Sequence, residues 1–297
     1  MTCPVCQSPV KFFTHIKGNI NVQSDTDTYD LYECTNCSHI FRTNHLDKNI
    51  YDDTYYAYNA AGDKLSTLFD WFFAHQNIFP INFVWNILQN FSRYQNMPYL
   101  KNGTVLDVGG GDGFALNFYK KLGNKTYNVE ILDWVVEASR KNGHETYKDL
   151  ILIPDSQVDL IRINQVLEHV SNPVYVIQQC QRVLKPGGKI VLGIPNIRSI
   201  SYDILKDNFD QLSLPDHIHF FSEKSIHLIL TGFNNVKIIY PLHKYGLVSN
   251  VYKLLIIKFH FPNNLFVSTI VNVCGIPVNI VSKLLKKTHL IDIICYK

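Results

Sequence analysis

Hydrophobic residues from position 104 onward fall into short runs that alternate with helical patterns. The run over 104–108 leads into a turn, after which Phe114, Ala115 and Leu116 begin the 3.6-residue apolar period of a helix over 115–122. The same alternation predicts strands over 127–132, 145–147, 158–163, 189–193, 236–240 and 291–296, and helices over 135–142 and 174–184. Strands that alternate with helices form a parallel sheet, so the pattern predicts an α/β fold with helices on both faces.

An apolar helical segment precedes this pattern. Residues 71–92 contain no Lys, Arg, Asp or Glu, and Pro80 predicts a division into two helices. Two interpretations stay open: the helices pack on the main domain, or they form a lid over a binding pocket with Tyr55, Tyr56 and Tyr58 near its mouth.

A second apolar segment lies within residues 242–290 and is free of charge over 259–282. Its length raises the question of a membrane span, but Pro277 and several asparagines argue against one. We expect two amphipathic helices, packed on the domain or lying on a membrane surface with Lys283, Lys286 and Lys287 toward the headgroups.

The composition favours a globular chain with one main domain over a nucleic-acid binder. The chain has 297 residues, of which 46% are hydrophobic and 18% charged, so it can bury one α/β core with a small accessory module. The net charge is +3, without a block of basic residues, which disfavours an extended nucleic-acid footprint. No secretory signal is visible at Met1, so we expect a cytoplasmic protein in which paired cysteines bind metal rather than form disulfides.

Two C-x2-C pairs near the start of the chain predict a structural zinc ribbon over residues 1–45. Four thiolates in two such pairs form a closed tetrahedral Zn²⁺ site, which is a folding element and offers no open position for a substrate. Gln7 and Ser38 occupy the positions where many ribbons carry glycine. The predicted ligands are Cys3, Cys6, Cys34 and Cys37.

The turn after the 104–108 run is rich in glycine. Such a turn between a strand and a helix lets a ligand lie against backbone amides at the helix N-terminus. Asp107 adds a carboxylate, which suits ribose hydroxyls and a cationic amino-acid tail better than a phosphate. The glycines are Gly109, Gly110, Gly111 and Gly113.

These residues resemble the first motif of the class I S-adenosylmethionine (SAM)-dependent methyltransferases, [DE]-x-G-x-G-x-G. The stretch 159–170, ending in V-L-E-H-V, and the stretch 182–188, R-V-L-K-P-G-G, resemble later motifs of the same family. The resemblance implies a Rossmann-like seven-stranded sheet whose seventh strand, 291–296, returns antiparallel between the fifth and sixth. It divides the chain into the ribbon, a helical lid or linker over 46–100, and a SAM-binding domain over 101–297 with the helical insertion.

The resemblance also implies which residues bind the cofactor SAM. Asp107 and the four glycines belong to the first motif, and Asn164 and Gln165 would lie beside the methionine part of the cofactor. Asp133, at the predicted end of the second strand, can accept hydrogen bonds from both ribose hydroxyls, and Trp134 can lie against the adenine. Glu168 and His169 are interpreted as residues that hold their loop together.

Two histidines are candidates for catalysis. His217 and His219 alternate, so on an extended segment both face one side, and a histidine there could take a proton from an acceptor. They also resemble metal ligands, although the sequence shows no third one.

The sequence therefore predicts a SAM-dependent methyltransferase that acts on a small-molecule acceptor, with a sugar or lipid-linked saccharide as the favoured class. A ribosomal or transfer RNA base methyltransferase is one alternative, and a catalytically silent SAM-binding scaffold or regulator is another. Peripheral membrane contact through 242–290 is a further expectation. The acceptor, the methylated atom and the oligomeric state stay open.

Overall fold

The computed structural model describes residues 1–17, 28–43, 66–88, 95–242, 246–259 and 265–297. Tyr55, Tyr56 and Tyr58, which the lid interpretation uses, lie outside these ranges.

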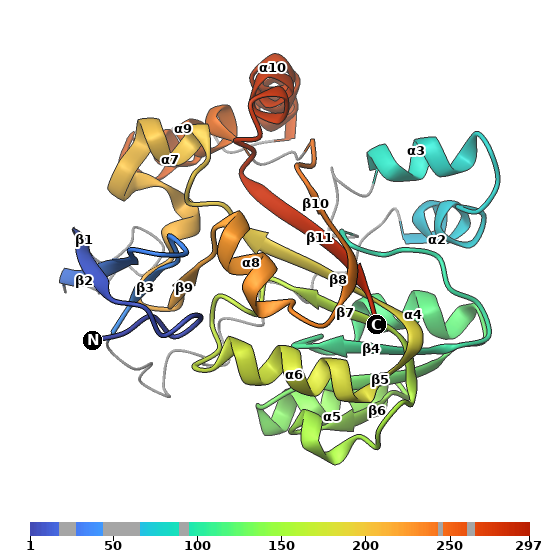
Figure 1. Cartoon of the computed structure of the whole chain (residues 1–297). Coiled ribbons are helices and arrows are strands. Elements are labelled where there is room, and N and C mark those ends of the chain that lie inside the picture. Colours follow the sequence, from blue (N-terminus) through green and yellow to red (C-terminus); the bar gives the residue numbers. More distant parts are fainter. Residues whose placement is uncertain (18–27, 44–65, 89–94, 243–245, 260–264) are drawn as a thin grey trace.

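A seven-stranded sheet forms the centre of the molecule (Figure 1). Its order is β10-β11-β8-β7-β4-β5-β6, and β11 runs antiparallel to both β8 and β10 while the other neighbours are parallel. The strands are β4 (Thr104–Val108), β5 (Lys125–Val129), β6 (Glu145–Tyr147), β7 (Val158–Asn164), β8 (Leu184–Pro195), β10 (Asn234–Ile239) and β11 (Leu290–Tyr296). The predicted seven-stranded α/β fold with its antiparallel last strand is confirmed.

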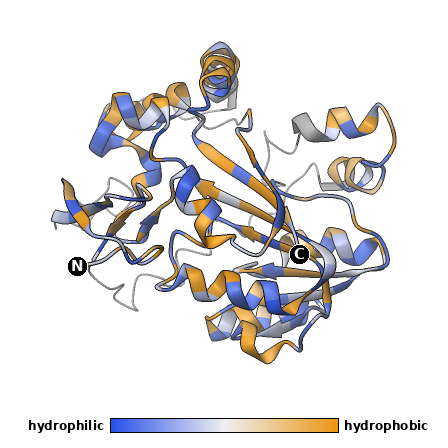
Figure 2. Cartoon of the chain, in the orientation of Figure 1, coloured by the Kyte–Doolittle hydropathy of each residue, from blue (hydrophilic) through white to orange (hydrophobic). Residues whose placement is uncertain are grey.

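Helices cover both faces of this sheet, because successive strand residues point to opposite sides. Val105 and Leu160 pack with Leu116 of one helix layer, whereas Leu106 and Ile161 pack on the other face. Hydrophobic colour accordingly follows the central strands (Figure 2). The helices flanking the sheet are α4 (Phe114–Lys121), α5 (Asp133–Lys141), α6 (Pro173–Val183) and α8 (Glu223–Ile229), with short 3-10 turns at Leu150–Leu152, Lys206–Asn208 and Asp210–Leu212.

Two short helices before the sheet pack against α4. They are α2 (Ser66–Ala74) and α3 (Ile81–Leu88), and Pro80 lies between them as the sequence predicts. Phe73 is buried against Tyr119 with ring centroids 5.0 Å apart, and Trp85 is buried beside it. The apolar content of this segment therefore extends the hydrophobic core on the α4 face.

The N-terminal ribbon shares a sheet with the main domain. Its strands are β1 (Val10–Lys17), β2 (Thr28–Cys34) and β3 (Ile40–Arg42), and β3 pairs antiparallel with β9 (His219–Phe220). Ser222 donates a hydrogen bond to the backbone carbonyl of Cys37, and Arg198 forms an ion pair with Glu33 at 2.8 Å. The ribbon is thus fixed to the segment that carries both candidate catalytic histidines.

The insertion forms two helices, as predicted. They are α9 (Leu247–Phe259) and α10 (Leu265–Leu284), which lie beside α7 (Ile200–Leu205) at one end of the molecule (Figure 1). Among the described residues, no helix has the length and apolar character that a membrane crossing requires.

Candidate active site

A cavity of about 1310 Å³ opens at the carboxyl ends of the parallel strands. Gly109, Glu130, Lys148 and Gln165 line it, and each directly follows a strand: β4, β5, β6 and β7. This edge is where open α/β sheets bind ligands, close to the point at which the strand order reverses. Arg42 and the ribbon's β3 form part of the opposite wall, so the cavity lies between the sheet and the ribbon.

The glycine turn requires glycine for two different reasons. Gly109 has φ +66°, and a Cβ there would lie 2.5 Å from Val166; Gly113 has φ +83° and would meet His144 at 2.2 Å. Both positions combine a left-handed backbone with a close neighbour, which only glycine accommodates. Gly109, Gly110 and Gly111 line the cavity, while Gly113 begins α4 behind it.

Glu130 is the acid that the structure places at this turn. Its carboxylate accepts hydrogen bonds from the amides of Gly111, at 3.1 Å, and Ile131, at 3.0 Å. Asn128 accepts from the Gly110 amide at 3.2 Å and so supports the same turn. The second strand ends at Val129, three residues before the predicted end, and this shift puts Glu130 at the cavity.

Asp133 is not among the residues that line the cavity. Its side chain is 81% exposed at the start of α5 and forms an ion pair with Lys148. The expectation that Asp133 holds the ribose stays a prediction. Trp134, the next residue, does line the cavity, and its side chain is partly exposed there.

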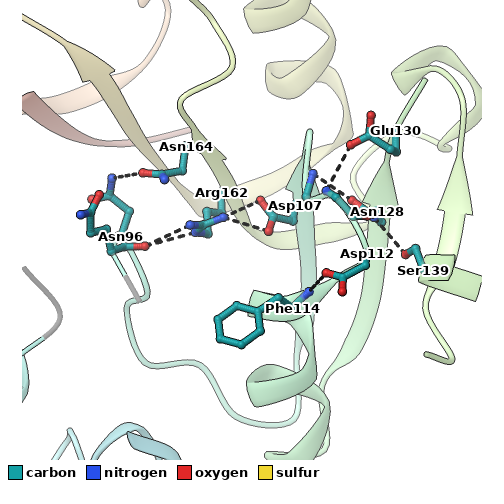
Figure 3. A network of polar contacts seen from close by, with 12 residues as sticks. Asn96, Asp107, Asp112, Phe114, Asn128, Glu130, Ser139, Arg162 and Asn164 are labelled. Carbon is teal, nitrogen blue, oxygen red and sulfur yellow. Dashed lines mark hydrogen bonds and ion pairs between the residues drawn. The ribbon is translucent and has the colours of Figure 1, made fainter. Parts of the chain in front are cut away.

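Asp107 faces the interior of the sheet and is not a wall residue of the cavity. Its two oxygens accept hydrogen bonds from one nitrogen of Arg162 at 3.1 and 3.0 Å, as Figure 3 shows. The two residues are register partners on β4 and β7, and both side chains are buried. Burial raises the pKa of Asp107, and the guanidinium of Arg162 opposes that change. The motif's acid thus forms a buried ion pair directly below the glycine turn.

The polar network continues from Arg162 toward β11. Arg162 also donates to the backbone carbonyl of Gln95. Asn96 donates to Asn164 at 2.9 Å, as Figure 3 shows. It also donates to Asp292 at 3.0 Å. Burial raises the pKa of Asp292 to about 7. Asn164 is therefore engaged inside this network rather than in the cavity wall.

Gln165 is the next residue and does reach the cavity. It has a left-handed φ of 57°, and its side-chain nitrogen is buried without a hydrogen-bond partner among the described residues. A buried amide donor without a partner at a cavity wall is suited to receive a ligand oxygen.

The two candidate histidines have different surroundings. His219 lines the cavity, and its Nδ1 lies 3.0 Å from Nε2 of His39, which comes from the ribbon. His217 lies behind the wall, where its Nδ1 donates to the backbone carbonyl of Gln211 at 2.7 Å. Burial lowers the pKa of His219 to about 4 and holds that of His217 well below its usual range. Both imidazoles are therefore neutral at pH 7, and His219 is the one with access to the cavity.

The four ribbon cysteines converge as a metal site requires. Their sulfurs lie within 4.8 Å of one another, with the pairs Cys3–Cys37 at 3.7 Å and Cys6–Cys34 at 3.4 Å. Backbone amides donate to the Cys3 and Cys34 sulfurs at 3.4 Å, as they do around thiolates. These contacts suit a tetrahedral Zn²⁺ shell.

Gln7 and Ser38 adopt the left-handed conformation that glycine usually supplies in such ribbons. Their φ angles are 59° and 55°. The two turns therefore keep their shape without glycine, at a conformational cost of about 1 to 2 kcal/mol each.

Sequence reasoning missed several residues of the site, among them Glu130 and Arg42. Glu130 was hidden because the apolar residues Ile131 and Leu132 extend the strand pattern beyond its true end. Arg42 gave no signal, because only the pairing of β3 with β9 brings it to the cavity. Strand ends and contacts between distant segments depend on the folded chain.

Comparison with known proteins identifies the family. The family model Methyltransf_23, described as a methyltransferase domain, matches residues 82–238, which is more than half of the chain. The chain belongs to this methyltransferase-domain family. Its seven-stranded sheet with the antiparallel last strand and its glycine motif agree with this family, as the sequence resemblance predicts.

Curated relatives match part of this chain. It is 31% identical over 107 residues to a ubiquinone biosynthesis O-methyltransferase of Xanthomonas oryzae pv. oryzae, covering 33% of this chain and 45% of the relative. It is 31% identical over 146 residues to an uncharacterized protein of Methanocaldococcus jannaschii, covering 47% of this chain and 68% of that protein. The chain thus spans less than half the length of the ubiquinone enzyme.

Solved structures of similar fold include a SAM-dependent methyltransferase from Archaeoglobus fulgidus. That structure has 20% identity and a TM-score of 0.47, covering 76% of this chain and 99% of its own. Phosphoethanolamine N-methyltransferase 2 of Haemonchus contortus has 15% identity and a TM-score of 0.44, covering 97% of this chain and 69% of its own.

Proposed function

We propose that this methyltransferase transfers the methyl group of SAM to an oxygen of a small-molecule acceptor bound between the sheet and the ribbon. The observation that carries the proposal is one continuous cavity, which reaches from the glycine turn and Glu130 to His219 and Arg42. Its volume suits a cofactor and a small acceptor together. The ubiquinone biosynthesis O-methyltransferase relatives support a small acceptor with a hydroxyl group.

Within this proposal, the residues of the chain bind and orient. SAM supplies a methyl group on a sulfonium, which is already a good leaving group, so positioning carries most of the catalysis. Glu130 would accept hydrogen bonds from the ribose hydroxyls of SAM. The amides of Gly109 to Gly111 would lie against the cofactor, and the side-chain amide of Gln165 would donate a hydrogen bond to one of its oxygens. Neutral His219 would accept the proton or hydrogen bond of the acceptor hydroxyl.

Transfer to an acceptor tests the function directly. Incubation with SAM and a panel of phenolic, sugar and lipid-linked saccharide acceptors should give S-adenosylhomocysteine together with a product heavier by one methylene, measured by mass spectrometry. Tight cofactor binding without product for any acceptor class would favour the silent scaffold instead.

A change at Glu130 tests the cofactor site. Glu130→Gln should weaken S-adenosylhomocysteine binding by about 1.5 to 3 kcal/mol, because hydrogen bonds from ribose to a charged acceptor are lost. Isothermal titration calorimetry measures the change. Asp133→Asn, an equivalent change three residues away on the exposed side of α5, is the matched control and should leave the affinity unchanged. A loss at Asp133 and none at Glu130 would reverse this assignment.

We also propose that α9 and α10 contact an anionic membrane surface, where a lipid-linked acceptor would be reached. Residues 247–289 contain five lysines and no Asp or Glu, and the two helices expose apolar side chains, among them Phe259, Val273 and Leu284. Lys253 and Lys287 form ion pairs with Asp210 and Asp203 of the neighbouring segment, whereas Lys283 and Lys286 lie at the end of α10 beside these apolar side chains. An apolar surface next to such lysines complements anionic headgroups.

Vesicle sedimentation tests this contact. The protein should bind vesicles of mixed anionic and zwitterionic lipid, release at high salt, and bind several-fold less after Val273→Gln with Leu284→Gln. Leu68→Gln, which alters an exposed leucine of α2, is the control and should not change binding. Equal vesicle binding by all variants, or no binding of the unaltered protein to these vesicles, would contradict the contact.

A further inference from the structure

Three side chains converge just behind the cavity wall. Glu168, His169 and His217 each offer a ligand atom, and these atoms lie within 4.8 Å of one another. The first two follow β7, and the third precedes β9. The amides of Ile218 and His219 donate to the Glu168 carbonyl at 2.7 and 3.1 Å, so backbone hydrogen bonds hold the two segments together.

Glu168 is a buried acid whose carboxyl group is not hydrogen-bonded to any described residue. Its side chain is fully buried, and neither carboxylate oxygen has a hydrogen-bond partner among the described residues. Burying a carboxyl group in this way is costly, and a native structure retains it only when something compensates. A cation bound between the carboxylate and the two imidazoles would provide that compensation.

A backbone carbonyl fixes the tautomer of both imidazoles. Nδ1 of His169 lies 3.0 Å from the carbonyl of Asp216, and Nδ1 of His217 lies 2.7 Å from that of Gln211. A carbonyl only accepts, so each Nδ1 carries the proton and each Nε2 carries the lone pair. Backbone carbonyls play the same orienting part behind many histidine ligands.

We propose that Glu168, His169 and His217 bind a divalent transition-metal cation, separate from the zinc of the ribbon. One carboxylate and two imidazoles form a ligand set for Zn²⁺, Fe²⁺, Co²⁺ or Mn²⁺. The four thiolates of the ribbon are softer ligands and favour softer metal ions. The cation would compensate the burial of the Glu168 carboxylate and leave further coordination positions for water or a ligand.

His169 belongs both to this cluster and to the cavity wall. A cation held there lies at the acceptor side of the cavity, where it can polarise an acceptor oxygen and favour its deprotonation. That consequence rests on the proposed function, while binding of the cation itself does not.

Cobalt titration tests the site independently of any methyl transfer. Protein whose ribbon is saturated with zinc is titrated with CoCl₂, and bound cobalt is followed by visible absorption and by elemental analysis. We expect about one additional cobalt ion per chain, with a spectrum that lacks a thiolate-to-cobalt band. Glu168→Gln should weaken cobalt binding at least about tenfold, with the zinc content unchanged.

Matched variants separate this site from the ribbon and from the fold. Glu137→Gln changes an exposed glutamate of α5 and should bind cobalt like the unaltered protein. If Glu168→Gln fails to fold, His217→Gln gives the decisive measurement, with circular dichroism and S-adenosylhomocysteine binding as checks of the fold. Absence of cobalt binding, binding that shows the thiolate band, or equal binding by a folded Glu168 or His217 variant would overturn the proposal.

Discussion

Asp107→Asn should lower the free energy of unfolding by about 3 to 5 kcal/mol, because it leaves the guanidinium of Arg162 buried without its counter-charge. Asp107 is 1% exposed, and both of its oxygens accept from Arg162. Removing one partner of such a pair costs more than the pair contributes, since the remaining charge stays in a poorly solvating interior. Urea unfolding monitored by circular dichroism measures the loss.

Two further variants make this result specific. Asp155→Asn breaks an ion pair with Arg182 in which the aspartate is 73% exposed, and it should cost less than about 1 kcal/mol. Replacing Asp107 and Arg162 together by leucine should restore much of the stability, because no charge is then buried. If Asp107→Asn proved as mild as Asp155→Asn, the buried pair would not stabilise the sheet as the geometry indicates.

Cys34→Ser should abolish zinc binding and lower stability by more than about 4 kcal/mol, a loss that a single substitution reaches when a structural metal site is destroyed. The ribbon also supplies β3, which pairs with β9 and forms one wall of the cavity. Acceptor turnover should therefore fall as well. Binding of S-adenosylhomocysteine should fall less, because Gly109, Gly111 and Glu130 follow strands of the main sheet.

Elemental analysis and thermal unfolding check this prediction. Cys274→Ser is the matched control, since Cys274 is an exposed cysteine of α10 outside the ribbon, and it should keep both the zinc and the melting temperature. Unchanged zinc content and stability in Cys34→Ser would remove the proposed zinc site.

The site was partly readable from the sequence. Glycines 109, 110 and 111 lie at the cavity as the motif indicates, since a strand, a tight turn and a helix are local features that the sequence encodes directly. The choice between Asp133 and Glu130 was not local. Which of the two acids lies in the cavity wall depends on where β5 ends. That end is set by the pairing of β5 with β4 and β6 and by the hydrogen bond that Glu130 accepts from the Gly111 amide.

The acid of the first motif shows the same limit in another form. Its position two residues before Gly109 is plain in the sequence, but its partner, Arg162, lies on β7 and becomes a neighbour only through the register of parallel strands. The sequence likewise shows His217 and His219 as an alternating pair. Folding separates them, with His219 at the cavity and His217 beside Glu168 and His169.

The sequence by itself determined the alternating α/β order, the two C-x2-C pairs and the glycine turn, because periodicity, short spacing and backbone conformation are properties of neighbouring residues. The antiparallel last strand followed from the family resemblance of the sequence. Only the tertiary structure decided that the ribbon joins β9, that Glu130 faces the cavity, and that Glu168 is buried beside two histidines. Each of these depends on contacts between residues far apart in the chain, and those contacts arise from packing and strand register rather than from local pattern.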